Sequence, residues 1–314
     1  MRTHLSAGLN QMNKFPSKTS EQYQPKYPLI IISKGRWETR HTAKAFERIG
    51  VRYYIAVEPQ EADNYRAVIN PTYGTVLELP FSNHGKGSGP ARNWIWEWSI
   101  AQGYERHWCI DDNITEFWRF HNNDRVRVET GSIFRAMEDF TDRFENVALA
   151  GPQYKFFCPD NYHHPPVLQN TRLMSCILIK NDLPFRWRGK YNEDVDLSLR
   201  CLKAGYCTFL FYAFLQGKLR TGTVKGGNTT EIYGDGTFEK SKMLVNLHPD
   251  CVKLVYRYGR WHHDCDMRPF RNNKLIIKPD AKFPDEPNEY GMKYVYGYGT
   301  SDAKIIDHTI PRVR

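Results

Sequence analysis

The stretch His107-Trp108-Cys109-Ile110-Asp111-Asp112-Asn113-Ile114 joins a short apolar run directly to two carboxylates and an amide. An apolar run of this length that stops at polar residues predicts a buried strand. In open α/β folds, ligands bind beyond the carboxyl ends of such strands. Adjacent carboxylates repel each other, and a divalent cation would hold them together. Asp and Asn also favour turns and helix caps, so this stretch alone leaves a purely structural role open.

Apolar runs alternate with segments of helical spacing on both sides of this stretch. Before and including it, strands are predicted at residues 27–32, 52–57, 75–79 and 107–110, and helices at residues 39–49, 60–68 and 91–101. After it, helices are predicted at residues 133–144 and 193–204, and strands at residues 147–150, 173–179 and 207–215. The β-α-β-α-β order of the first part predicts an α/β fold with a parallel sheet covered by helices on both faces.

The composition is that of a globular protein of 314 residues, with 44 Lys and Arg against 35 Asp and Glu and a net charge of +9. No apolar run approaches the roughly 18–20 residues that a membrane span needs. The amino terminus lacks the apolar segment of a secretory signal. The seven cysteines are odd in number and scattered, which favours reduced thiols. We therefore expect a cytoplasmic protein with no membrane segment.

The positive charge is concentrated at the two ends of the chain. Residues 1–50 carry nine Lys or Arg and three Asp or Glu, and residues 251–314 carry twelve and eight. Residues 101–150 carry six and ten. Basic ends around an acidic middle suit a phosphate-rich partner and a metal-holding centre, although a solvated basic surface would give the same balance.

A second acidic cluster, Glu193 and Asp194, opens the helix predicted at residues 193–204. Carboxylates are favoured in the first turn by the helix dipole, so capping is the structural interpretation. Two neighbouring carboxylates cannot both cap the helix. One of them could face a cleft as a general base.

Two loops contain backbone amides and cationic side chains that could bind an anion. Residues 85–89 form a glycine-rich loop before a helix whose first turns hold Arg92 and Asn93. Backbone amides at a helix amino terminus together with an arginine suit a diphosphate, although the loop matches neither a Walker A nor a dinucleotide-binding pattern. Residues 33–36, Ser-Lys-Gly-Arg, follow the first strand and bring two more cations to the sheet edge.

Taken together, these elements resemble the GT-A family of nucleotide-sugar glycosyltransferases across residues 27–205. The resemblance implies a Rossmann-like mixed sheet flanked by helices, a uridine diphosphate sugar as donor, and Mn²⁺ or Mg²⁺ as cofactor. It implies Asp194 as catalytic base with Glu193 beside it, and inversion at the anomeric carbon. It further implies donor contacts from Ser33, Arg36, Glu58, Arg92, Asn93 and Asp111, and metal ligation by Asp112, Asn113 and a late histidine, for which His248 is our candidate and His262 and His263 the alternatives. Asn113 stands where a last acidic ligand is usual.

Four motifs in the last third of the chain indicate a narrower family. They are Gly226-Gly227-Asn228, Lys240-Ser241, His248-Pro249-Asp250 and Gly259-Arg260-Trp261-His262-His263. With the motifs at residues 33–36 and 111–114, they resemble the TET-associated glycosyltransferases of bacteriophages. That resemblance implies transfer of the sugar to a hydroxymethylated pyrimidine in phage DNA, chiefly 5-hydroxymethylcytosine.

A DNA acceptor would account for cations interleaved with aromatic residues in the loop-rich carboxyl-terminal region. We expect a polar arm over residues 1–26, a catalytic core over 27–215 and an acceptor region over 216–314. The candidate DNA contacts are Lys218, Arg220, Lys225, Arg257, Arg260, Trp261 and Arg271. An aromatic core with basic residues at its rim is the competing interpretation.

Two other functions remain open from the sequence. One keeps the glycosyltransferase and changes the acceptor to a glycan, a lipid-linked sugar or a protein, although the absence of a membrane segment counts against a lipid. The other is a non-catalytic DNA-binding protein or a nucleotidyltransferase, for which Lys86 would be the activating lysine of the nucleotide loop.

Overall fold

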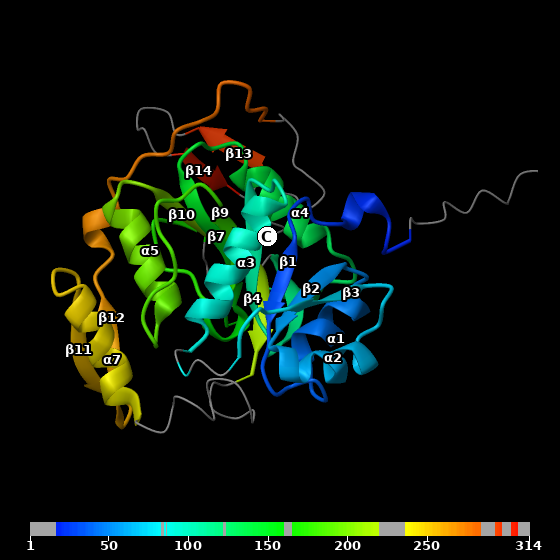
Figure 1. Cartoon of the computed structure of the whole chain (residues 1–314). Coiled ribbons are helices and arrows are strands. Elements are labelled where there is room, and N and C mark those ends of the chain that lie inside the picture. Colours follow the sequence, from blue (N-terminus) through cyan, green and yellow to red (C-terminus); the bar gives the residue numbers. More distant parts are fainter. Residues whose placement is uncertain are drawn as a thin grey trace, which may run out of the picture.

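A large mixed sheet with helices on both faces forms the body of the molecule (Figure 1). The computed structural model describes residues 17–82, 85, 87–121, 124–159, 165–219, 236–283, 293–296 and 303–306. The strands are β1 (Leu29–Ile32), β2 (Tyr53–Val57), β3 (Gly74–Glu78), β4 (Arg106–Asp111), β5 (Ile114–His121), β6 (Asp124–Arg127), β7 (Val147–Tyr154), β8 (Val167–Gln169), β9 (Cys176–Lys180), β10 (Cys207–Lys218), β11 (Val252–Arg257), β12 (Arg260–Cys265), β13 (Lys293–Tyr296) and β14 (Ala303–Ile306). The helices are α1 (His41–Arg48), α2 (Ala62–Val68), α3 (Gly89–Ala101), α4 (Ser132–Thr141), α5 (Glu193–Lys203) and α7 (Gly236–Leu247), with 3₁₀ turns η1 (Glu21–Tyr23), η2 (Pro59–Glu61), η3 (Lys155–Phe157) and η5 (Arg268–Phe270).

The order of the main sheet is β3-β2-β1-β4-β9-β7-β10-β5-β6, and β8 pairs with β10. Strands β1 to β4 are parallel, as the alternation in the sequence predicts. Strand β9 is antiparallel to both β4 and β7, while β10 is parallel to β7 and antiparallel to β5. The fold class, an α/β protein with a Rossmann-like mixed sheet, is therefore confirmed. The central strands β4, β7 and β9 are buried along almost their whole length because helices cover both faces.

An apolar cluster lies between the sheet and the helices on each of its two faces. Helices α1 and α4 pack on one face of the sheet, and α3 and α5 pack on the other. In β7, a Cβ at Gly151 would lie 2.2 Å from the carbonyl oxygen of Cys176. Glycine at this position therefore permits the close approach of β7 to β9, next to the sheet edge that carries the polar residues described below.

The carboxyl-terminal region contains more regular structure than the sequence analysis assigns to it. Helix α7 and the β11–β12 hairpin pack against the outer side of α5 (Figure 1). Val195 and Leu199 of α5 meet Leu244 of α7 and Val252 of β11 in a third apolar cluster. Strand β10 extends to Lys218, and the expected division of the chain at residue 215 stays a prediction.

The described part of the expected amino-terminal arm is attached to the core. Buried Gln24 donates to the carbonyl of Gly50 at 2.8 Å. The backbone N–H of Lys26 donates to Glu138 Oε2 at 2.6 Å. Residues 17–26 are therefore held by hydrogen bonds to the turn after α1 and to α4.

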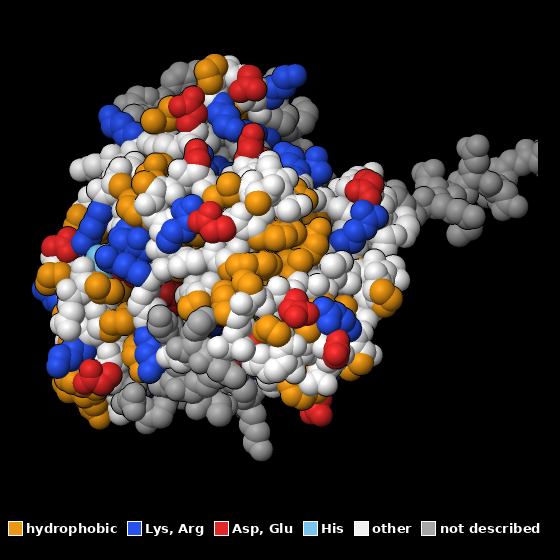
Figure 2. All heavy atoms as spheres, viewed as in Figure 1, with side chains coloured by type: hydrophobic (Ala, Val, Ile, Leu, Met, Phe, Trp, Pro, Cys, Tyr) orange, Lys and Arg blue, Asp and Glu red, His pale blue; other side chains and the backbone are white. Residues whose placement is uncertain are grey.

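Three other expectations concern the whole chain. All seven cysteines are unpaired, as predicted. No described helix has the length and apolar character needed to cross a membrane. On the face shown in Figure 2, acidic and basic side chains are interspersed rather than gathered into one basic patch.

Candidate active site

Asp111 is the last residue of β4 and lies at the centre of a polar cluster at the carboxyl edge of the sheet. Its Oδ1 accepts a hydrogen bond from Arg92 Nη2 at 2.8 Å, and its Oδ2 accepts one from Lys218 Nζ at 2.6 Å. Burial alone would raise the pKa of Asp111, but the charges of Lys218 and Arg92 hold it well below its ordinary value. Asp111 is therefore a carboxylate with a cation on each oxygen.

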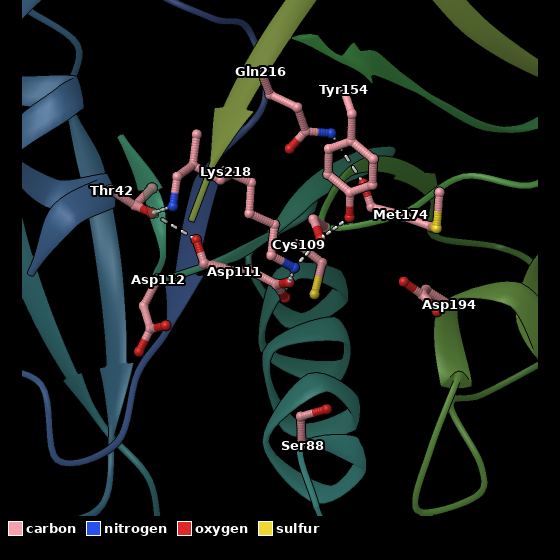
Figure 3. Close-up of polar contacts among 12 residues, drawn as sticks. Thr42, Ser88, Cys109, Asp111, Asp112, Tyr154, Met174, Asp194, Gln216 and Lys218 are labelled. Carbon is pink, nitrogen blue, oxygen red and sulfur yellow. Dashed lines mark hydrogen bonds and ion pairs between the residues drawn. The ribbon is translucent and has the colours of Figure 1, made fainter. Parts of the chain in front are cut away.

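Lys218 connects Asp111 to strands β7 and β9. Its ammonium donates to Ser175 Oγ at 2.5 Å, and Ser175 Oγ lies 2.6 Å from the hydroxyl of Tyr154. Burial disfavours the ammonium, but Asp111 and Tyr154 outweigh this effect and raise the pKa of Lys218. The sequence predicts a DNA contact for Lys218. Its side chain points into the cluster toward Asp111 (Figure 3), and the DNA contact stays a prediction.

Arg92 links Asp111 to the start of α5. It is 4% exposed, and its Nε lies 3.0 Å from Ser88 Oγ and 3.3 Å from Glu193 Oε1. Its guanidinium also lies over the ring of Trp187, 4.7 Å from the centroid. Arg92 and Glu193 thus come together as the sequence suggests, with Glu193 held by an ion pair.

Asp194 lies beside Glu193 and has a different environment. Its Oδ1 accepts the backbone N–H of Val195 at 2.8 Å, and its side chain is half-buried. Burial and the neighbouring charge of Glu193 raise the pKa of Asp194 to about 6, against the opposing effect of Arg92. A carboxylate with a pKa near neutrality suits proton transfer.

Asp112 points to the other side of β4, away from Asp111 (Figure 3). Its Oδ2 accepts from Ser33 Oγ at 2.7 Å, and its Oδ1 forms a short ion pair with Arg36. The hydroxyl of Tyr65 on α2 lies 2.6 Å from Ser33 Oγ and accepts the N–H of Arg36 at 3.1 Å. The structure therefore brings the loop after β1, predicted to bind the donor, together with Asp112, predicted to bind a metal.

Three further residues contribute on the Asp112 side of β4. The sequence predicts a donor contact for Glu58 and no role for Tyr65 or Thr42. Buried Glu58 lies 3.1 Å from Lys34 Nζ, so it belongs to the same loop cluster. Tyr65 was missed, because a tyrosine in a polar helical segment gives no sign that it reaches the loop. Thr42 was missed as well: its hydroxyl donates to the carbonyl of Asp111 and accepts the N–H of Ile114, and it thereby fixes the turn after β4.

Two further candidates make structural contacts, and their predicted roles in binding stay predictions. Asn93 uses both ends of its amide on the backbone of Trp187, at 3.0 and 2.8 Å, and so holds that loop on α3. His248 is buried, with Nε2 at 2.9 Å from Asp196 and Nδ1 at 3.0 Å from Lys203. Both ring nitrogens are occupied, and the structure does not bring His248 to Asp112.

Among the described residues, one group of three potential metal ligands from His, Cys, Asp and Glu has its ligand atoms within 4.8 Å of one another, namely His248, Asp250 and Cys251. Lys203 Nζ contacts both His248 and Asp250, which makes this group a poor metal site. At the end of β4, by contrast, Asn113 Oδ1 is buried and has no hydrogen-bond partner within the described part of the chain. That oxygen and the two aspartates are donors of the kind that Mg²⁺ and Mn²⁺ prefer.

The remaining candidate DNA contacts lie outside this cluster. Arg257, Arg260 and Trp261 are exposed on the β11–β12 hairpin, and Arg271 is exposed after η5. The alternative histidines also lie on β12, where burial lowers the pKa of His263 to about 4. The expected contacts Arg220 and Lys225 fall outside the described residues.

The chain matches the family model described as TET-Associated Glycosyltransferase over residues 27–227. No protein with a curated description matches it. Among solved structures, it is similar to the inositol-1-phosphate CTP transferase from T. maritima, with 11% sequence identity, a TM-score of 0.34, and coverage of 63% of this chain and 89% of that chain. The family match includes every residue of the cluster around Asp111 and extends over more than half of the sequence, and the chain therefore belongs to the TET-associated glycosyltransferase family.

Proposed function

We propose that this protein transfers a sugar from a uridine diphosphate sugar to the hydroxymethyl group of a modified pyrimidine in DNA, chiefly 5-hydroxymethylcytosine. The observation that carries the proposal is the arrangement around Asp111. A cluster of Ser33, Arg36 and Asp112 lies on one side of it, and Asp194, with its raised pKa, lies on the other (Figure 3). Donor and acceptor would meet between them.

A diphosphate donor would bring more negative charge than the cluster around Asp111 can neutralise. Asp111, Glu193 and Asp194 carry up to three negative charges, and the cations beside them are Arg92, Lys218 and Lys240. A diphosphate would add further negative charge, and the protein cations are already paired. We propose that Asp112 and the unpartnered oxygen of Asn113 hold Mn²⁺ or Mg²⁺, without His248. When bound, the cation would neutralise charge that develops on the leaving diphosphate.

The protein's own residues would carry out the proton transfer. Asp194 would accept the proton of the acceptor hydroxyl while that oxygen forms a bond to the anomeric carbon. The bond from the anomeric carbon to the diphosphate oxygen breaks on the opposite face, so the configuration inverts and uridine diphosphate leaves. A positioned base contributes about 10²–10⁴ in rate.

The direct test is incubation of the protein with several uridine diphosphate sugars and either hydroxymethylated or unmodified DNA, with the nucleosides analysed by mass spectrometry. A mass gain confined to the hydroxymethylated nucleoside is the expected result, and EDTA should abolish it. A glycan or protein that gains the sugar while DNA does not would support the alternative glycosyltransferase. Release of pyrophosphate from a nucleoside triphosphate would support a nucleotidyltransferase.

Asp194→Asn tests the base assignment. The variant is expected to lose transfer by at least about 10²-fold because the amide cannot accept the proton, while its affinity for uridine diphosphate stays nearly unchanged. The wild-type rate should rise with pH through about 6, as Asp194 loses its proton, and the residual rate of the variant should lack this step. Normal turnover of the Asn variant would refute the assignment.

A further inference from the structure

Two phenylalanines stand exposed next to the cluster around Asp111. Phe156 is 87% exposed and Phe157 is 51% exposed, both on η3, the turn that follows β7. Burying a phenylalanine stabilises a protein substantially, so two adjacent exposed rings are unusual without a partner. Their position relative to Asp111 suggests what that partner is.

The rings continue a line of contacts that begins at Asp111. Lys218 joins Asp111 to Ser175, and Ser175 contacts the Tyr154 hydroxyl. The ring of Phe157 lies 5.9 Å from that of Tyr154. The ring of Phe156 lies 5.5 Å from that of Phe157, nearly perpendicular to it. The exposed pair therefore adjoins the polar cluster rather than a remote surface.

The pair also lies on the acceptor side of this cluster. Tyr154 and Asp194 are both on the side of Asp111 opposite to Asp112 (Figure 3). Burial and, to a smaller degree, the nearby carboxylates of Asp111 and Asp194 raise the pKa of the Tyr154 hydroxyl, so Tyr154 lies close to Asp194. The nucleoside of the donor is proposed to lie on the side of Asp112, so a flat group stacked on Phe157 would belong to the acceptor.

Basic side chains lie next to the turn that carries the two rings. Lys155, in the same turn, lies with its ammonium 3.6 Å from the centroid of the Trp118 ring, and Arg127 of β6 lies over the same ring at 5.1 Å. Both contact the single carboxylate of Glu116, which leaves one excess positive charge in this group. Arg125 lies near Cys158, the residue after Phe157. Cations around exposed rings suit phosphates around a base.

We propose that Phe156 and Phe157 form a stacking surface for a base of the acceptor DNA, which holds the nucleotide while its hydroxymethyl group reaches Asp194. The inference rests on the proposed function and specifies how the acceptor is held. Stacking is tolerant of base identity because every base has a π face. Stacking thus contributes to the affinity for DNA. The hydroxymethylated base is selected because only its hydroxymethyl group reaches Asp194.

The test compares Phe157→Ala, Phe156→Ala and the double variant with Phe157→Trp, which keeps an aromatic ring. Ile276→Ala, which removes an exposed apolar side chain elsewhere, is the matched control. The alanine variants should raise KM for hydroxymethylated DNA by about 5- to 150-fold, the equivalent of about 1–3 kcal/mol per base. KM for the donor and transfer of its sugar to water should stay constant, and Phe157→Trp should restore KM for DNA.

A second measurement uses DNA with 2-aminopurine at or beside the acceptor position. Stacking on the rings should quench its fluorescence with the wild type and the Trp variant but not with Phe157→Ala. One outcome refutes the stacking surface and leaves the proposed function standing. In it, the wild type glycosylates DNA, and the alanine variants show the same KM for DNA and the same quenching of 2-aminopurine as the wild type. If the wild type turns over the donor but modifies a protein or glycan instead of DNA, both proposals fail.

Discussion

Lys218 follows a long apolar strand and precedes further basic residues in the sequence, a context that suggests contact with phosphates. The structure pairs it with Asp111 at 2.6 Å. A lysine in an acidic cluster and a lysine on a DNA-binding surface have the same local sequence. Asp111 is 107 positions away along the chain, so no local pattern could reveal their contact. Asp111, Arg92 and Asp194, by contrast, could be picked out from strand and helix boundaries.

The residue-scale prediction concerns Lys218→Met, which keeps the length of the side chain and removes its charge. Loss of a charge-assisted hydrogen bond costs about 1.5–3 kcal/mol, so transfer should fall by roughly 10- to 100-fold. DNA affinity in gel shifts should stay unchanged, whereas Arg260→Ala on the exposed hairpin should lower it. Weakened DNA binding with normal turnover in Lys218→Met would support the DNA contact predicted from the sequence.

Helix α3 positions the site through contacts that its sequence pattern does not reveal. Its start carries Arg92, which reaches both Asp111 and Glu193. The next residue, Asn93, holds the backbone of Trp187, and the Trp187 ring in turn packs on Arg92. Proximity to the glycine-rich loop made Asn93 a candidate for nucleotide binding. The helix, however, turns consecutive side chains in different directions, and only packing determines which of them faces the cleft.

At the element scale, Asn93→Ala should lower the free energy of unfolding by about 1–3 kcal/mol, because it leaves the N–H and carbonyl of Trp187 without their partner. Chemical denaturation measures this change. Glu97→Ala on the same helix is the control: Glu97 forms an exposed ion pair with Arg186, which contributes at most about 1 kcal/mol. Unchanged stability combined with lost nucleotide affinity in Asn93→Ala would show that Asn93 binds the nucleotide.

The whole molecule depends on buried polar groups between its sheet and its helical layers. His107 in β4 is completely buried, with Nδ1 at 2.6 Å from Asn181 Oδ1. The Asn181 amide donates to Ser99 and to the carbonyl of Tyr104, so its oxygen must accept the proton of Nδ1. His107 Nε2 has no partner among the described residues. Burial lowers the pKa of His107 to about 4, since a second proton would have no acceptor.

This histidine predicts a loss of stability in acid. Between pH 6.5 and about 4 the unfolded chain takes up a proton at His107 while the folded protein does not, so the free energy of unfolding falls as pH is lowered. The slope from this group is at most about 1.4 kcal/mol per pH unit. His107→Asn keeps an N–H near the Nδ1 position and cannot titrate, so its stability curve should be flatter across this range. An unchanged slope in the variant would exclude His107 as the source.

By itself, the sequence determined the alternation of strands and helices, the polar ends of β1 and β4, and the acidic start of α5, because these follow from periodicity and from residues that end an element. It also contained the motifs of the family. Only the tertiary structure decided the antiparallel position of β9, the separation of Asp111 from Asp112, the partners of Lys218, Asn93 and His248, and the exposure of Phe156 beside Tyr154. Apart from the exposure of Phe156, next to Phe157 whose ring adjoins Tyr154, these features arise where segments far apart in the chain meet, and the free energy of such contacts depends on geometry that no local pattern encodes.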